Sequence, residues 1–214
     1  MKDITKRFFW VSLYAIAMAL LEALLVVYLR HGLPWTSTDK FARVSYISME
    51  SWREAATIIM FIAVGWLAGR QKIDRWAYGL YAFGLWDIWY YIWLKVLIDW
   101  PATLLDWDTL FLIPVEWQGP VLSPVLIALL ICLSSVLAVV RTTRGERLAI
   151  SPIHISVILL GGLLALYTFM ANALQTALLN QPRPFEVFDW PLFLVAFALM
   201  VVPSLMVTWP RARV

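Results

Sequence analysis

Six long apolar blocks follow one another along the chain, and they constrain its fold more than any other feature. They cover approximately residues 8–30, 50–69, 76–98, 120–140, 151–179 and 190–209. A helix that crosses a lipid bilayer needs about 20 predominantly apolar residues. The sequence therefore predicts an all-α, polytopic membrane protein whose six transmembrane helices form a single domain over residues 1–214.

The composition excludes a water-soluble fold. Hydrophobic residues make up 62% of the chain and charged residues 14%, whereas a soluble domain has about 45–50% apolar and about 25% charged residues. The basic residues lie in small groups at the ends of the apolar blocks, and this dispersal excludes a nucleic-acid surface. The expected partners are the lipid bilayer and either further copies of the chain or the other subunits of a membrane complex.

The distribution of positive charge predicts the orientation. If the N-terminus is inside, 11 of the 17 Lys and Arg residues lie in inner segments, which fits the positive-inside rule for a cell (inner or plasma) membrane. The segment after Lys2, Lys6 and Arg7 resembles the start of a signal peptide. Its apolar run is too long for one, so we expect it to be a membrane span. The prediction is a multi-pass protein with both termini inside.

The connection between the third and fourth blocks, residues 99–119, differs from an ordinary loop. It combines Trp, Leu and Pro with acidic residues and contains no Lys or Arg. This pattern indicates a short helix that lies along the outer interface or re-enters the protein. Its acidic residues Asp106, Asp108 and Glu116 are candidates for the rim of a site, and its Trp residues could equally dock a partner.

Polar residues inside the apolar blocks are the main candidates for function, because an ionisable group costs about 2.5–3.5 kcal/mol at the centre of a membrane helix. A helical rise of 1.5 Å per residue places five of them, Glu22, Glu54, Asp87, Tyr91 and Lys95, roughly 5–16 Å from the outer end of their spans. We therefore hypothesise a polar, outward-facing site for binding or proton relay. Its candidate residues are Glu22, Glu50, Arg53, Glu54, Asp87, Tyr90, Tyr91, Lys95, Asn172 and Gln175.

The same residues also permit a purely structural interpretation. Arg53 can pair with Glu50 or Glu54, and Glu22 needs a partner such as Arg53, Lys95 or a Tyr hydroxyl. Asp87 and the span-five amides can join helices by hydrogen bonds. The glycine pairs Gly65/Gly69 and Gly161/Gly162 indicate close helix packing rather than chemistry.

Three functions remain open. The first is cation- or proton-linked transport of a small solute, the second is an embedded enzyme acting on a lipid or lipid-linked substrate at the outer leaflet, and the third is a structural or assembly subunit. A divalent ion, if one binds, would use Glu22, Glu54 and Asp87, since carboxylate oxygens suit hard cations. The sequence indicates no particular cofactor, and it lacks the phosphate-loop, zincin, serine-hydrolase and Cys-x-x-Cys motifs.

Overall fold

Six helices and one β-hairpin make up the computed structural model, which describes residues 2–32, 40–112, 115–179 and 187–208. In chain order the elements are α1 (Lys2–Gly32), α2 (Lys40–Ala68), α3 (Lys72–Ile98), β1 (Trp107–Phe111), β2 (Trp117–Pro120), α4 (Leu122–Thr143), α5 (Pro152–Leu179) and α6 (Trp190–Thr208).

The helices coincide with the six predicted apolar blocks. All except α3 are long and apolar enough to cross a membrane, so the expectation of a multi-pass, helical membrane protein is confirmed. Helix α3 has 27 residues and is long enough as well. Its lower hydropathy comes from its many Trp and Tyr residues together with Asp87 in its middle and the charged residues at its two ends.

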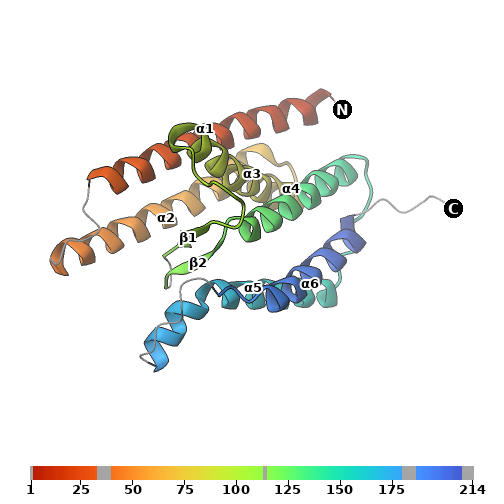
Figure 1. Cartoon of the computed structure of the whole chain (residues 1–214). Coiled ribbons are helices and arrows are strands. Elements are labelled where there is room, and N and C mark those ends of the chain that lie inside the picture. The colour runs from red at the N-terminus through yellow and green to blue at the C-terminus, as the bar shows by residue number, and fades with distance from the viewer. Residues whose placement is uncertain (1, 33–39, 113–114, 180–186, 209–214) are drawn as a thin grey trace.

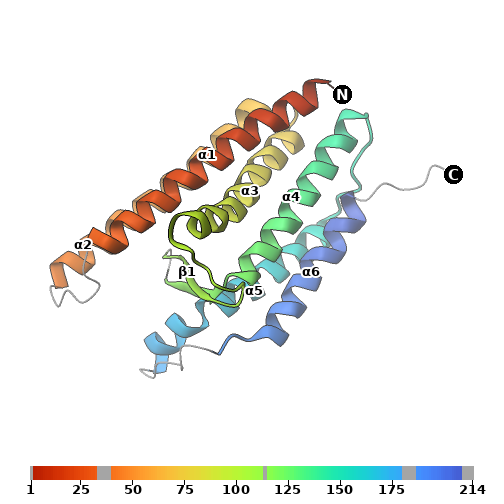
Figure 2. The same ribbon diagram turned by 45° about the horizontal axis from the view of Figure 1, so that its top comes forward.

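The helices run along one another in two groups (Figures 1 and 2). Helix α3 is central in the first group, where it packs against α1, α2 and α4, whereas α5 and α6 pair with each other and reach the first group through α4 and α6. The start of α1 and the end of α6 lie at the same end of the bundle. Six helices that alternate in direction place these two ends together.

Two apolar cores correspond to the two groups. The first core includes Ala15, Phe61, Tyr78 and Trp86, from α1, α2 and α3. The second is built around three aromatic residues: Phe169 of α5, Phe188 just before α6 and Phe193 of α6. Helix α4 contributes to both, with Val139 in the first core and Leu126 against the second.

Glycines set the closest helix contacts. A Cβ atom at Gly65 would lie 2.3 Å from the carbonyl oxygen of Arg75, and one at Gly161 would lie 2.7 Å from the carbonyl oxygen of Ala196. These positions join α2 to α3 and α5 to α6 backbone to backbone, as in other membrane helix pairs. The predicted packing role is confirmed for Gly65, Gly69 and Gly161, but Gly162 meets no atom within 4 Å.

The predicted interfacial or re-entrant helix between spans three and four is wrong. Strands β1 and β2 form an antiparallel hairpin there, in which Trp107 lies opposite Pro120 and Asp108 opposite Gly119. The residues of β1, Trp-Asp-Thr-Leu-Phe, include types that favour strands over helices. The preceding loop is fixed by Asp106, whose carboxylate accepts hydrogen bonds from the Ala102 backbone N–H (2.7 Å) and the Thr103 hydroxyl (2.8 Å).

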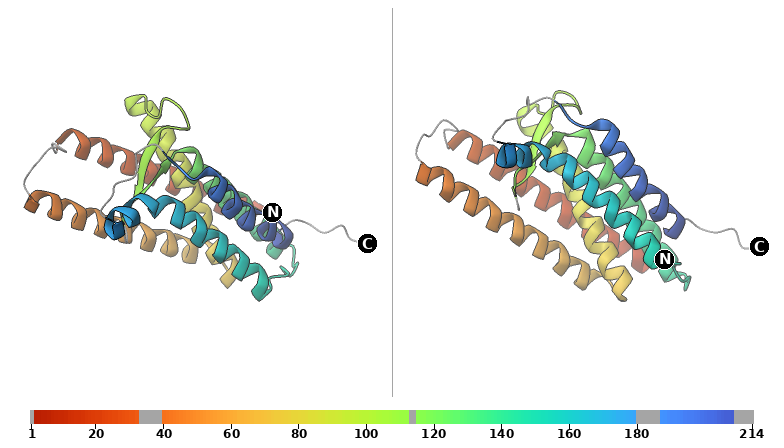
Figure 3. Two further views of the ribbon diagram at one scale, coloured as in Figure 1. Left: turned by 60° about the horizontal axis from the view of Figure 1, so that its bottom comes forward. Right: turned by 90° about the horizontal axis from the view of Figure 1, so that it is seen from below.

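The hairpin lies at one end of the bundle, between the two helix groups (Figure 3). Phe111 packs against the first core, whereas Trp107, Leu110 and Trp117 pack against the second. Gly119 is buried, and a Cβ there would lie 3.1 Å from the ring of Phe169. The hairpin is therefore a packed joint between the two groups, and its side chains take part in both cores.

The opposite end of the bundle carries a buried polar cluster that the sequence analysis did not single out. The Thr142 hydroxyl donates a 2.6 Å hydrogen bond to Asp74, which joins α4 to α3. Arg141 donates to Glu146 at 2.8 Å and to the carbonyl oxygen of Val207 at 2.7 Å, which joins α4 to α6. These contacts tie the helix ends together.

Candidate functional site

An ion pair joins α1 and α2 close to the hairpin end of the bundle. The Arg53 guanidinium contacts the Glu22 carboxylate, and both side chains are largely enclosed, with 24% and 10% of their surface exposed. Of the partners that the sequence allowed for Glu22, the structure selects Arg53. A carboxylate that stays charged among apolar helices needs such a partner.

Glu54, one residue further along α2, holds the hairpin. Both of its carboxylate oxygens accept from the backbone N–H of Leu112, at 2.9 and 3.1 Å, and the residue is only 4% exposed. Leu112 directly follows β1, where the ladder to β2 ends. Glu54 thus satisfies a strand-end donor that would otherwise lack a partner.

Two further carboxyl groups, one on α3 and one on β1, interact electrostatically. Asp108 on β1 is buried and hydrogen-bonds with the hydroxyl of Tyr91 on α3. Asp87 lies one helical turn before Tyr91, and its carboxyl group interacts electrostatically with that of Asp108. The Oδ2 atom of Asp87 is buried and has no hydrogen-bond partner among the residues that the structure describes.

Two tryptophan N–H groups also lack hydrogen-bond partners in the described part of the chain. The indole N–H of Trp86, next to Asp87, and that of Trp117, on β2, are both buried without a hydrogen-bond acceptor in the described part of the chain. Buried polar atoms in native proteins almost always have a partner, which can be an ordered water or an ion. The oxygen of Asp87 that lacks a partner in the described part of the chain is therefore a position where a proton, water or small ligand can bind.

The second strand connects the site to α5. Asn172 donates a 3.1 Å hydrogen bond from its amide to the side-chain oxygen of Gln118 on β2. The side-chain oxygen of Gln175, one turn further along, is buried without a partner among the described residues. Polar side chains of α5 thus turn toward the hairpin, whereas the Thr168 hydroxyl bonds within its own helix to Ala165.

Other predicted site residues lie outside this arrangement. Lys95 forms a 2.7 Å ion pair with Asp99 at the exposed end of α3, and this contact, through its hydrogen bond and charge, lowers the pKa of Asp99. Glu116 is exposed and accepts from the Thr109 hydroxyl at 3.2 Å. The Thr103 hydroxyl hydrogen bond lowers the pKa of Asp106, consistent with its role in the loop.

Tyr90 lies beside the site, with its ring 5.1 Å from that of Tyr91 and 6.3 Å from that of Trp86. Glu50 falls in α2, but its side chain is outside the described residues.

The candidate metal ligands are not brought together. Glu22 contacts Arg53, Glu54 binds the Leu112 backbone and Asp87 interacts electrostatically with Asp108. Within the described ranges, no group of three or more His, Cys, Asp or Glu side chains is placed to hold a metal ion. The structure thus separates the predicted polar residues into an ion pair, a hairpin anchor and a carboxyl pair.

Sequence reasoning missed the partners that the hairpin supplies. Asp108 was expected at the rim, yet it lies under the hairpin against α3, and Gln118 was not considered. The available signal was the two-residue alternation of β1, which turns Asp108 to the face opposite its immediate neighbours.

The fold and these contacts define a polytopic α-helical membrane protein with a buried carboxyl pair at a joint between two helix groups. Compared with protein-family models, with curated proteins and with solved structures, the chain matches none of them.

Proposed function

We propose that this protein is a six-span carrier that couples movement of a small solute to a proton or another cation bound at Asp87 and Asp108. The observation that supports this most strongly is the buried carboxyl pair, in which Asp87 has an oxygen with no partner among the described residues. Two buried carboxyl groups whose charges repel each other in an apolar region favour a state in which one of them holds a proton or a cation is bound nearby.

In this proposal α3 crosses the membrane as well, in addition to the five helices that are apolar enough to do so by themselves. Its 27 residues amount to about 40 Å of helix, which exceeds the roughly 30 Å hydrocarbon core. It also packs against α1, α2 and α4, and its mid-helix carboxylate Asp87 has a buried Oδ2 atom, so lipid need not contact this group. With the N-terminus inside, the hairpin and the carboxyl pair belong to the outer half of the membrane.

The hairpin supplies a physical reason why proton or cation binding would affect the whole bundle. It is attached to α2 through Glu54 and to α5 through the Gln118–Asn172 hydrogen bond. A change of charge on Asp108 alters its attraction to Tyr91 and its repulsion of Asp87. A displacement of the hairpin that follows would be transmitted to both helix groups.

A proton-flux assay tests the proposal. The purified protein is reconstituted in vesicles that contain a pH-sensitive dye, and a potassium diffusion potential drives proton entry. We expect wild type to admit protons faster than empty vesicles, and we expect Asp87→Asn and Asp108→Asn to abolish the difference. Glu116→Gln, which removes an exposed carboxylate of the same hairpin region, should retain it.

Two results would contradict proton movement through this site: no flux above that of empty vesicles, or equal flux in wild type and Asp87→Asn. Correct folding of each variant is checked by its elution volume in detergent. This control separates loss of the site from loss of the protein.

A structural or assembly subunit is the second candidate. It is favoured by the Glu22–Arg53 pair and the Glu54–Leu112 contact, because both are satisfied within the chain and need no ligand. In that case the variants at Asp87 and Asp108 would lower stability, and the protein would show no flux.

A further inference from the structure

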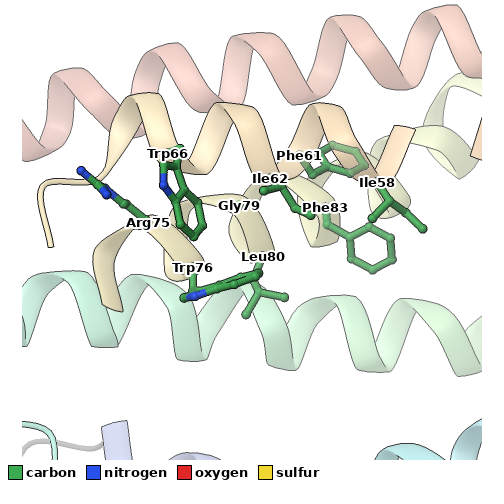
Figure 4. Close-up of a pocket in the computed structure, with 9 residues that line it drawn as sticks. All are labelled: Ile58, Phe61, Ile62, Trp66, Arg75, Trp76, Gly79, Leu80 and Phe83. Atoms are coloured by element: carbon green, nitrogen blue, oxygen red, sulfur yellow. The ribbon is translucent and has the colours of Figure 1, made fainter. Parts of the chain in front are cut away.

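A second feature lies away from the carboxyl pair, on the membrane-facing surface between α2 and α3. The close approach of these helices at Gly65 and Gly79 leaves a groove of about 280 Å³. Figure 4 shows Ile58 and Phe83 at one end of this groove, and Trp66, Trp76 and Arg75 at the other. Arg75 is the one charged residue among those that line it.

The groove is open to the surroundings of the protein. Trp66, Trp76 and Leu80 on its walls are 41%, 52% and 47% exposed, and around a membrane-spanning pair of helices the surroundings are lipid. From Ile58 to Trp66 it follows about 12 Å of helix, close to the roughly 15 Å of hydrocarbon in one leaflet. Its length and apolar lining suit an acyl chain.

The charged end of the groove suits an anionic headgroup. The Arg75 guanidinium lies 5.7 Å from the centre of the Trp66 ring, at one end of the groove. The nearest acidic residue in sequence, Asp74, accepts from Thr142 instead. Trp66 and Trp76 close to the helix ends are typical of headgroup depth, where a phosphate would lie.

We propose that this groove binds one anionic phospholipid, with an acyl chain along Phe83, Leu80 and Ile62 and the phosphate on Arg75. Guanidinium groups form paired hydrogen bonds with phosphate oxygens, and an Arg near a membrane surface adds about 1 kcal/mol to the attraction of an anionic lipid. In the expected orientation this site faces the inner leaflet. It is separate from the carboxyl pair and does not depend on the transport proposal.

Native mass spectrometry of the full-length protein in detergent tests the site, with phosphatidylglycerol as the anionic probe and phosphatidylcholine as the neutral one. We expect one phosphatidylglycerol to bind wild type roughly fivefold more tightly than phosphatidylcholine. Arg75→Gln should remove this preference, and Arg75→Lys should keep part of it. Arg144→Gln, an exposed basic residue at the same end of the bundle, should not change it.

Two further measurements distinguish a bound phospholipid from other occupants of the groove. Leu80→Trp narrows the groove and should weaken the binding of both lipids. Inorganic phosphate should not compete with phosphatidylglycerol if the acyl chain is required for binding. If Arg75→Gln and Arg144→Gln lost the preference for phosphatidylglycerol to the same extent, the site would be overturned, because net charge alone would then explain the binding. Competition by phosphate would overturn the lipid assignment, as would a dimer of the protein that Leu80→Trp dissociates.

Discussion

At the scale of single residues, the intramembrane charges serve three different purposes. Glu22 pairs with Arg53, Glu54 binds a backbone N–H, and Asp87 interacts electrostatically with Asp108. The sequence predicted which residues are costly, because an ionisable group inside an apolar block is visible without a structure. It included Arg53 among the possible partners of Glu22, but it did not predict the contacts of Glu54 and Asp87. Leu112 contributes only its backbone N–H, and Asp108 comes from a strand whose path the helical pattern does not specify.

Removing one member of the α1–α2 ion pair should destabilise the protein. Glu22→Gln leaves Arg53 without this carboxylate in an enclosed position, and breaking a buried pair costs about 3 kcal/mol or more. Replacing both residues, in Glu22→Gln/Arg53→Gln, should cost less than the single change, because no charge is then left behind. Unfolding by dodecyl sulfate in mixed micelles measures these free energies, with Glu116→Gln as the control. If the single variant were as stable as the control, the pair would have no structural role.

At the scale of elements, the helices follow directly from the lengths of the apolar blocks. Residues 151–179 were expected to be helical, and α5 covers Pro152–Leu179. The hairpin could not be derived in the same way, since residues 99–119 mix apolar and acidic residues in a pattern compatible with an amphipathic helix or a strand. Packing selects the strand over the helix, because Trp107 and Leu110 contact the second core and Phe111 contacts the first core.

The α5–α6 contact gives a matched test with two adjacent glycines. Gly161→Ala places a Cβ 2.7 Å from the Ala196 carbonyl oxygen, whereas Gly162→Ala meets nothing within 4 Å. We expect Gly161→Ala to destabilise the protein by about 1–3 kcal/mol through overpacking. Gly162→Ala should stabilise it by roughly 0.5–1 kcal/mol, because alanine is the better helix former. The same dodecyl sulfate titration compares them, and an equal effect of both substitutions would refute this packing of α5 on α6.

At the scale of the whole molecule, two helix groups meet at α4 and at the hairpin. The class of protein was predictable, because five of the helices are apolar and long enough to span a membrane by themselves. The joint was not predictable, because it depends on contacts between distant residues, such as Gln118 with Asn172 and Glu54 with Leu112. The candidate site lies at this joint, so proton or cation binding there can affect both groups.

The central claim is that Asp87 and Asp108 share a site that holds a proton or another cation. Infrared difference spectroscopy of the protein in lipid, between acidic and alkaline pH, tests it most directly through the carbonyl stretch of a protonated carboxyl group. We predict that such a band titrates in wild type, disappears in both Asp87→Asn and Asp108→Asn, and persists in Glu116→Gln. If the band is absent from wild type, or if it survives both substitutions, the carboxyl pair holds no exchangeable proton and the proton-linked account is contradicted.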